Sequence, residues 1–222
     1  MRRALYAGRL DRTGICRTLP GMSDSTSTGL LLVLSGPSGV GKTTIAHRVQ
    51  ERFDGIFSVS ATTRPRSSDE VDGEDYRFVD PDTFRTMLAA GEFLESAEVF
   101  GKHAYGTPRA PVRERLDEGR LVILDIDVQG ARQVRDSMPE SFMLFILPPS
   151  EEELHRRLEA RGRDDEEAIQ RRFAEARHEI ELATTSDLYD AFVVNTDLEI
   201  AIQETCELIA ARMRHGGRGP TT

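Results

Sequence analysis

Cysteine and long apolar runs are both scarce in this chain of 222 residues. The two cysteines, Cys16 and Cys206, form no CxxC pair, and the five histidines are scattered, so neither a disulfide framework nor a zinc site is indicated. No apolar run approaches the roughly 20 residues that a membrane-spanning helix needs. These absences predict a protein of the reducing cytoplasm that has no membrane partner.

Positive charge is also in deficit, because the formal net charge is −9. A general nucleic-acid binder neutralises phosphates with an excess of Lys and Arg, so no nucleic-acid partner is expected and any basic patch is local. The hydrophobic share of 38% and the charged share of 30% are typical of a globular chain. The length suits one α/β domain with small insertions, and it leaves open whether the protein is a monomer or a homo-oligomer.

The beginning of the chain differs in composition from the rest. Residues 1–21 carry five arginines against one acid, Asp11, and lack the apolar stretch of a secretory signal. We expect residues 1–28 to be a flexible leader. It is either an organellar transit peptide or a stretch that precedes a true start at Met22. We also expect the last eight residues, 215–222, to fray.

Apolar runs of strand length then alternate with segments of helical period, which is α/β organisation. Four runs are nearly continuous, as in parallel strands that are covered on both faces: 30–34, 121–124, 142–147 and 191–194. Helical patterns follow them at 43–53, 130–138, 150–161 and 199–213. The predicted fold is therefore a doubly wound parallel sheet with helices on both sides.

Two regions interrupt this alternation. Residues 56–109 hold short strand-like pieces at 57–60 and 76–79 around a helix-like stretch at 82–90, which predicts a small mixed α/β insertion. Residues 151–184 are rich in both arginine and acids, and a break at 161–163 separates two helices, which predicts a helical lid. The predicted domain spans 29–222, with its core formed by residues 29–55, 110–150 and 185–214.

The segment from Gly36 to Thr43 matches G-x-x-x-x-G-K-[ST] at every fixed position, after a strand and before a helix. Its glycines allow backbone N–H groups to turn toward an anion, and the helix adds its positive end. Lys42 supplies a cation for the β- and γ-phosphates, and the Thr43 hydroxyl suits Mg²⁺. The motif predicts a P-loop NTPase fold that binds ATP through Gly36, Pro37, Ser38, Gly39, Val40, Gly41, Lys42, Thr43 and Thr44.

The acceptor has to be inferred from the insertion. Arg64 and Arg66 flank a stiffening proline, and arginine grips phosphate oxygens bidentately. Further along the insertion stand two phenols, a carboxylate and hydroxyl groups: Ser60, Tyr76, Glu95, Tyr105 and Thr107. This set suits a nucleoside monophosphate that carries guanine, whose N1–H and N2–H₂ donate to a carboxylate while its O6 accepts from Ser or Thr. Adenine has an acceptor at N1 and would leave the carboxylate unpaired.

Plainer interpretations of these residues stand beside the functional ones. Arg64 and Arg66 can pair with Asp69 and Glu70 at the surface. Tyr76 can be a core residue of a strand, and Glu95 can be a solvated carboxylate at a helix end.

Two acids follow the buried run at 121–124. Asp125 and Asp127 are two residues apart, so both are expected on one face at the carboxyl end of a strand, where open α/β sheets bind ligands. Asp125 suits Mg²⁺ through water, and Asp127 suits a base or ribose-side contact. The alternative for Asp127 is that it only caps the helix that begins near Gln129.

The motifs together resemble those of guanylate kinases, a family of P-loop nucleoside monophosphate kinases. The resemblance runs from about Leu30 to Arg214 through GPSGVGKTT, SVSATTR, GEDYRFV, FLESAEVFG, ILDIDVQG, LPPS and RLEARG. It implies transfer of the γ-phosphoryl group of ATP to GMP with Mg²⁺, which gives ADP and GDP. It also implies that GMP is held by Ser60, Arg64, Tyr76, Glu95, Tyr105, Thr107 and Asp127, and Arg66 is a further candidate ligand of the GMP phosphate.

The resemblance assigns further roles outside the insertion. Lid arginines that close on ATP and the transferring phosphoryl group fall on Arg157, Arg161 and Arg172, which with Lys42 and Arg64 form the implied catalytic set. Thr43 and Asp125 are the implied metal residues, and Asn195 is expected to border the adenine.

The sequence departs from the family in two places. The usual R-x-x-R becomes Arg64-Pro65-Arg66, which leaves Ser67 at the usual place of the second arginine. The tract before Tyr105 is one residue longer than usual.

Two other functions fit parts of this pattern. A P-loop kinase for a sugar phosphate would share the phosphate loop, and the base-and-phosphate set argues against it. A non-catalytic guanylate-kinase-like module that binds proteins would not need the intact loop with Lys42 and Thr43.

Overall fold

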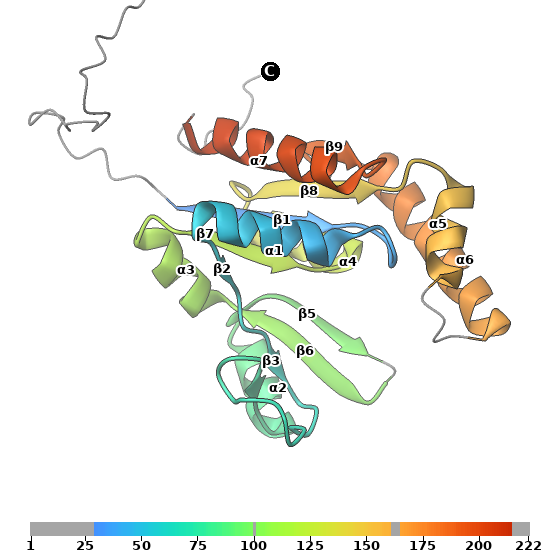
Figure 1. Cartoon of the computed structure of the whole chain (residues 1–222). Coiled ribbons are helices and arrows are strands. Elements are labelled where there is room, and N and C mark those ends of the chain that lie inside the picture. The colour runs from blue at the N-terminus through green and yellow to red at the C-terminus, as the bar shows by residue number, and fades with distance from the viewer. Residues whose placement is uncertain (1–28, 100, 161–164, 215–222) are drawn as a thin grey trace, which may run out of the picture.

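The computed structural model describes residues 29–99, 101–160 and 165–214, and Figure 1 shows a core sheet with two attachments. The core sheet has five strands in the order β2-β7-β1-β8-β9, and every neighbouring pair is parallel. Its strands are β1 (Leu30–Ser35), β2 (Ile56–Phe57), β7 (Leu121–Asp125), β8 (Phe142–Leu147) and β9 (Ala191–Val194). The predicted doubly wound parallel sheet is confirmed.

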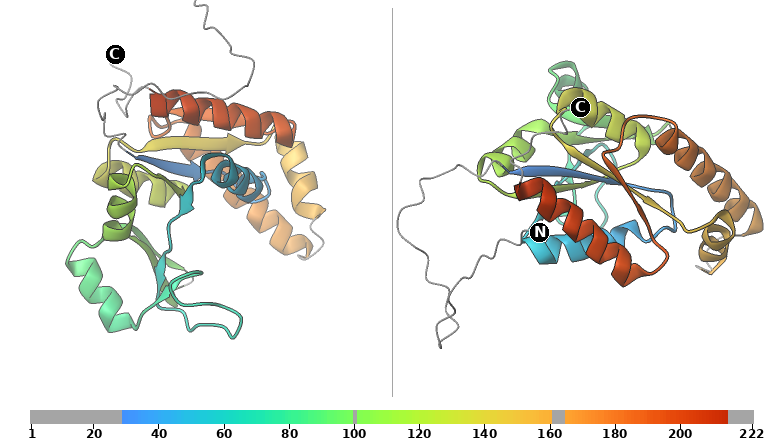
Figure 2. Two further views of the ribbon diagram at one scale, coloured as in Figure 1. Left: turned by 60° about the vertical axis from the view of Figure 1, so that its left-hand side comes forward. Right: turned by 90° about the horizontal axis from the view of Figure 1, so that it is seen from above.

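Helices cover both faces of this sheet because its strands are apolar at consecutive positions. Leu30, Leu32 and Leu34 pack on one face with helices α1 (Lys42–Phe53) and α7 (Leu198–Arg214). Leu31 and Val33 pack on the other face, which is covered by α3 (Arg109–Asp117), α4 (Val128–Ser137) and part of α6 (Glu166–Thr184). Figure 2 shows α1 and α7 side by side on their face. The central strand β1 is thus buried on both sides, and the loop that follows it rests on a rigid base.

The first attachment is a mixed insertion with a second sheet of four strands, in the order β4-β3-β6-β5. It contains β3 (Ala61–Thr62), β4 (Arg77–Phe78), β5 (Phe93–Val99), β6 (His103–Pro108) and α2 (Pro81–Ala89). Its small core is built on Phe84 of α2 and Phe93 of β5, whose rings stack with centroids 4.6 Å apart.

The strand predicted at 57–60 is wrong as a single element. Ile56 and Phe57 pair with β7 of the core sheet, whereas Ala61 and Thr62 pair with β6 of the insertion. Residues 58–60 belong to neither strand because the chain crosses there from one sheet to the other. An apolar pattern predicts strand length and cannot show that two half-strands belong to different sheets.

The second attachment is formed by α5 (Glu151–Glu159) and the first half of α6, as the predicted lid requires. Leu154 and Leu158 of α5 pack against Ala176 of α6 in a small core of their own. The predicted break at 161–163 lies outside the described residues. Among the helices that are described, none has the length and apolar content to span a bilayer.

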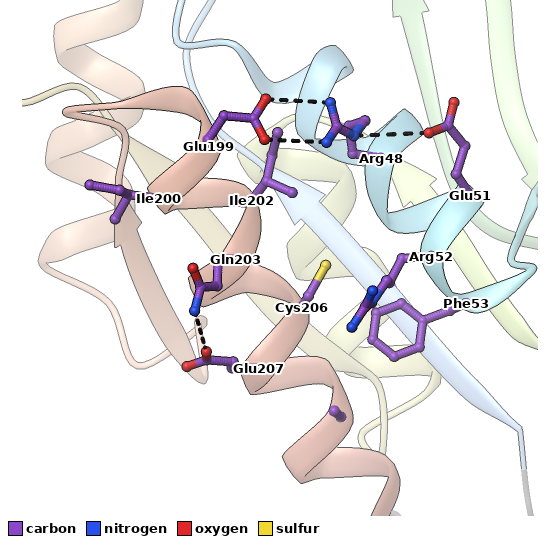
Figure 3. Close-up of a pocket in the computed structure, with 11 residues that line it drawn as sticks. Arg48, Glu51, Arg52, Phe53, Glu199, Ile200, Ile202, Gln203, Cys206 and Glu207 are labelled. Atoms are coloured by element: carbon purple, nitrogen blue, oxygen red, sulfur yellow. Dashed lines mark hydrogen bonds and ion pairs between the residues drawn. The ribbon is translucent and has the colours of Figure 1, made fainter. Parts of the chain in front are cut away.

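A groove with a volume of about 780 Å³ runs between α1 and α7, away from the phosphate loop (Figure 3). Arg48 on α1 is linked there to Glu199 on α7 by hydrogen bonds of 3.4 and 3.2 Å. Cys206 lines the same groove, and burial raises the pKa of its thiol despite the nearby Arg52 and Arg48. Cys206 is therefore a partly buried thiol whose protonated form is favoured.

We expect Cys206 to react slowly with a thiol reagent, because the thiolate is the nucleophile and a raised pKa reduces its share at a given pH. A Cys16→Ser variant isolates this thiol. Its rate with a disulfide reagent at pH 8 should be lower than that of free cysteine and should level off at a higher pH. The same variant in denaturant serves as the control. An equal rate for the folded and the unfolded variant would contradict the expectation.

Candidate functional site

The phosphate loop joins β1 to α1, and its shape depends on glycine. Gly41, at the N-terminus of α1, has φ +93°, a conformation that side chains rarely adopt. A Cβ atom at this position would lie 2.7 Å from the Asn195 side-chain amide. The backbone is therefore pressed against the end of β9, and the first turn of α1 faces a cavity of about 370 Å³. The lining of the cavity comprises Gly36, Pro37, Ser38, Gly39, Gly41, Lys42, Thr43, Thr44, Asp125, Asp127 and Glu179.

Lys42 and Asp125 form an ion pair across this cavity, with 2.8 Å between Lys42 Nζ and Asp125 Oδ1. Both side chains are mostly buried, with exposed fractions of 20% for Lys42 and 27% for Asp125. Lys42 begins α1 and Asp125 ends β7, so the pair links the helix after the phosphate loop to the strand beside β1. The two predicted ligands of triphosphate and metal are thus adjacent.

Asp127 does two things in the structure. As the N-cap of α4, its Oδ1 accepts a hydrogen bond of 2.7 Å from the Gly130 backbone N–H. The same side chain lines the phosphate-loop cavity. Asp127 therefore caps the helix, which begins at Val128, as the alternative interpretation expected. It also lines the phosphate-loop cavity, so the capping does not remove it from the predicted site.

The lid reaches the phosphate loop through Arg172 of α6, whose Nη2 donates to Ser38 Oγ at 2.7 Å. Arg157 of α5 donates from Nε to Glu153 at 2.8 Å and from Nη2 to the Asn195 carbonyl at 3.1 Å. Two of the three predicted lid arginines therefore contact the loop or the β9 end beside it. The third, Arg161, lies outside the described residues.

Asn195 lies beneath the loop with 3% exposure. Its side-chain amide donates to the Val40 carbonyl at 2.7 Å, which ties the phosphate loop to the residue after β9. Its Oδ1 is buried without a partner among the described residues. The structure thus places Asn195 in contact with the loop, and its expected contact with adenine stays a prediction.

Glu179 is a residue of this cavity that the sequence analysis missed. It lies on α6 seven residues after Arg172, and this spacing returns to nearly the same face of a helix. Burial raises the pKa of Glu179 to about 7, and Asp127 and Glu175 add to the rise while Lys42 opposes it. The spacing from a predicted lid arginine was the signal that could have found it.

Glu95 is buried on β5, with 8% exposure, so the interpretation as a solvated helix-end carboxylate is wrong. Its Oε1 accepts a hydrogen bond of 2.6 Å from the Thr107 hydroxyl on β6. Burial raises the pKa of Glu95, with the Asp127 charge as a smaller cause and the Thr107 hydrogen bond opposing. A Cβ atom on Gly130 would stand 3.4 Å from both Glu95 Oε2 and Asp127 Oδ1, so the two carboxylates flank the start of α4.

Arg64 lies among both predicted tyrosines. Its guanidinium carbon is 5.4 Å from the centroid of the Tyr76 ring, and the Tyr76 and Tyr105 rings are 6.0 Å apart. The pKa of Arg64 is raised chiefly by its hydrogen bond with Glu70, and the Tyr105 hydroxyl adds to the rise. The structure therefore brings together three of the residues that are predicted to hold GMP, each on a strand of the insertion or next to one.

Arg64 also has an acidic partner, and Arg66 and Ser60, two other residues of the predicted GMP-binding set, have fewer contacts. Arg64 pairs with Glu70, as the plainer interpretation allowed, with Nη2 2.5 Å from Oε1. Arg66 is exposed and makes no hydrogen bond or ion pair with the described residues. Ser60 is half-buried between the two sheets, and its carbonyl accepts from the Arg77 N–H at 2.9 Å.

The fold and the site define a P-loop nucleoside monophosphate kinase: a parallel sheet with a P-loop after its central strand, an insertion that carries Arg64 and the buried Glu95, and lid arginines that reach the loop. The family model described as guanylate kinase matches residues 28–212. The chain therefore belongs to the guanylate kinase family.

Individual relatives agree with this assignment. A guanylate kinase of Trichormus variabilis is 49% identical over 181 residues, which cover 81% of this chain and 89% of the relative. A guanylate kinase of Thermus thermophilus is 48% identical over 190 residues, 86% of this chain and 84% of the relative. The crystal structure of guanylate kinase from Anaplasma phagocytophilum is 37% identical with a TM-score of 0.61, over 87% of this chain and 89% of that one. These findings favour an ATP:GMP phosphotransferase over the sugar-phosphate kinase and the protein-binding module.

Proposed function

We propose that this chain transfers the γ-phosphoryl group of ATP to GMP and that it holds the two nucleotides in separate pockets. The ATP phosphates bind in the cavity of the phosphate loop, and GMP binds on the insertion. The observation that carries the proposal is the buried Glu95, held by Thr107 and lying beside Asp127, which itself lines the ATP cavity. A buried acceptor of this kind suits the N1–H and N2–H₂ donors of guanine.

Phosphoryl transfer needs little covalent chemistry from the protein, so positioning and charge carry the catalysis. Lys42 neutralises charge on the β- and γ-phosphates, and the lid arginines Arg157, Arg161 and Arg172 neutralise the transferring group. Arg64 holds the GMP phosphate in line with it, with Tyr76 and Tyr105 as neighbours. Closure of the lid and the insertion excludes water, which would otherwise hydrolyse ATP.

The residues at the loop fit Mg²⁺. Thr43 and Asp125 offer hard oxygen ligands in the same cavity. Within the described residues no group of three or more His, Cys, Asp or Glu forms a metal cage, which suits an ion that keeps its waters and binds with the nucleotide phosphates. Thr43 and Asp125 would hold the ion, which supplies charge neutralisation on the phosphates. Lys42, which pairs with Asp125, would turn to the nucleotide phosphates when they bind. The scarcity of cysteine supports a cytoplasmic setting for the reaction.

The test is a steady-state assay of ADP formation with ATP, Mg²⁺ and one of four acceptors: GMP, AMP, dTMP or CMP. We expect turnover with GMP and little with the other three. Omission of the acceptor is the control for ATP hydrolysis. Equal turnover of AMP and GMP would refute the proposal.

A further inference from the structure

Arg64 is held by Glu70, an acidic residue of its own loop. Its Nη1 donates to Glu70 Oε2 at 3.0 Å, and its Nη2 donates to Glu70 Oε1 at 2.5 Å. This is an end-on, bidentate pair, and the Glu70 side chain is only 19% exposed. Arg64 is also expected to bind the phosphate of GMP. The same guanidinium therefore has to bind two anions.

Glu70 is itself fixed in place. Its Oε2 also accepts a hydrogen bond of 2.8 Å from the Ser67 backbone N–H. Arg64 and this backbone contact lower the pKa of Glu70 to about 2, so the side chain stays ionised at neutral pH. The backbone of the 64–70 loop therefore holds the Glu70 carboxylate in place against Arg64.

The remaining contacts show which donors of Arg64 are already used. Nη1 also donates to the Pro65 carbonyl at 3.0 Å and to Ser67 Oγ at 3.4 Å. These bonds and the pair with Glu70 occupy Nη1 and one N–H of Nη2. None of these bonds uses the Nε–H or the second N–H of Nη2, and the hydroxyl of Tyr105, itself a predicted GMP ligand, is a further hydrogen-bonding partner of the guanidinium. In a planar guanidinium these two donors share one edge, which has the spacing for a bidentate grip on phosphate oxygens.

Aromatic rings also lie against the guanidinium. The Arg64 carbon lies 5.4 Å from the Tyr76 centroid and 5.7 Å from the Phe78 centroid. The Tyr105 hydroxyl interacts with the same group. Three rings and one carboxylate thus restrict a side chain that would otherwise sample many rotamers, and ordering a side chain before binding lowers the entropic cost of binding.

We infer that Glu70 is a positioning residue for the substrate phosphate: it holds the Nη1–Nη2 end of Arg64 and thereby leaves the Nε–Nη2 edge oriented for GMP. This inference rests on the proposed function. Glu70 and the phosphate bind adjacent edges of one cation through different N–H groups, so they do not compete for the same donors. Ser67 occupies the place of a second arginine in the family pattern, so Arg64 is the principal cation of this loop and its orientation matters more.

The experiment is a Glu70→Gln variant, which keeps the shape and removes the charge, beside Asp69→Asn as the matched control. Asp69 is exposed, adjacent in sequence and without an ion pair among the described residues. We expect the KM for GMP to rise about tenfold in Glu70→Gln, the scale of one weakened charge-assisted hydrogen bond. The KM for ATP should stay within about twofold, and Asp69→Asn should resemble the wild type in both.

Guanosine separates a phosphate effect from a general distortion of the pocket. As an inhibitor competitive with GMP it lacks the phosphate, so its inhibition constant should be the same in the wild type and in Glu70→Gln. A Glu70→Asp variant keeps the charge and should give an intermediate KM for GMP. If Glu70→Gln unfolds at a lower temperature, Glu70→Asp carries the comparison.

Two results would overturn the inference. A KM for GMP that is unchanged or lower would show that Glu70 is idle or competes with the phosphate. An equal loss of guanosine and GMP binding would show that Glu70 only supports the fold of the insertion. Neither result can be confused with a failure of the proposed function, which would appear as a wild type that does not use GMP.

Discussion

A Glu95→Gln variant is expected to lose most of the preference for GMP over AMP, which in the wild type should reach roughly 10⁴-fold in kcat/KM. The reason is that a buried polar group left unpaired by the wrong base costs more than a missing apolar contact. Glu95 is 8% exposed and has Thr107 as its hydrogen-bonding neighbour. The carboxylate accepts two N–H groups of guanine, whereas the amide of Gln offers one acceptor and one donor, and the donor suits N1 of adenine.

The measurement is kcat/KM for GMP and AMP in the wild type and in the variant. Glu98→Gln is the matched control, because Glu98 lies on the same strand β5, is exposed and loses the same charge. An unchanged GMP preference in Glu95→Gln would remove guanine recognition from this residue. A crystal of the wild type with GMP provides a direct check, since the guanine should lie against Glu95.

Removal of the Lys42 ammonium group should lower kcat at least about 10²-fold, the scale of one preorganised electrostatic group in phosphoryl or acyl transfer. Lys42 is placed at the first position of α1, and its Nζ lies 2.8 Å from Asp125 in the phosphate-loop cavity. Lys42→Ala therefore removes the cation that is expected to meet the γ-phosphate, and it leaves the GMP pocket on the insertion untouched.

The control for Lys42→Ala is Lys102→Ala, since Lys102 is the other lysine of the chain and is exposed. GMP affinity, measured by calorimetry, should be the same in both variants and in the wild type. Thermal unfolding shows whether the loss of the ion pair with Asp125 has changed the stability. Near-normal turnover of Lys42→Ala would contradict the role given to this lysine.

The core of the fold could be predicted because its signals are local. Continuous apolar runs predicted β1, β7, β8 and β9, since a strand covered on both faces needs apolar residues at consecutive positions. The phosphate loop was also predictable, because its glycine spacing and its flanking strand and helix follow each other along the chain. The helix α3 (Arg109–Asp117) and the hairpin of β5 and β6 were not predicted as elements. Their residues carry a weaker apolar pattern, and packing between the insertion and the core stabilises them.

The functional site, like the fold, could be predicted from the sequence only in part. The residue types for triphosphate and for guanine were evident from the sequence, and the family resemblance gave their positions. Burial of Glu95 and the presence of Glu179 in the phosphate-loop cavity were not evident, and the pair of Arg64 with Glu70 was one of several pairings that the sequence left open. Each depends on contacts between segments that the sequence keeps apart or on which face of an element a side chain occupies.

The sequence by itself determined the sheet, the phosphate loop and the class of chemistry, because hydrophobic periodicity and motif spacing act within a dozen residues. Only the tertiary structure decided which carboxylates are buried, which are paired and which line the cavity. Burial and pairing depend on surfaces that meet after folding, and they set the charge state and the free donors on which recognition depends.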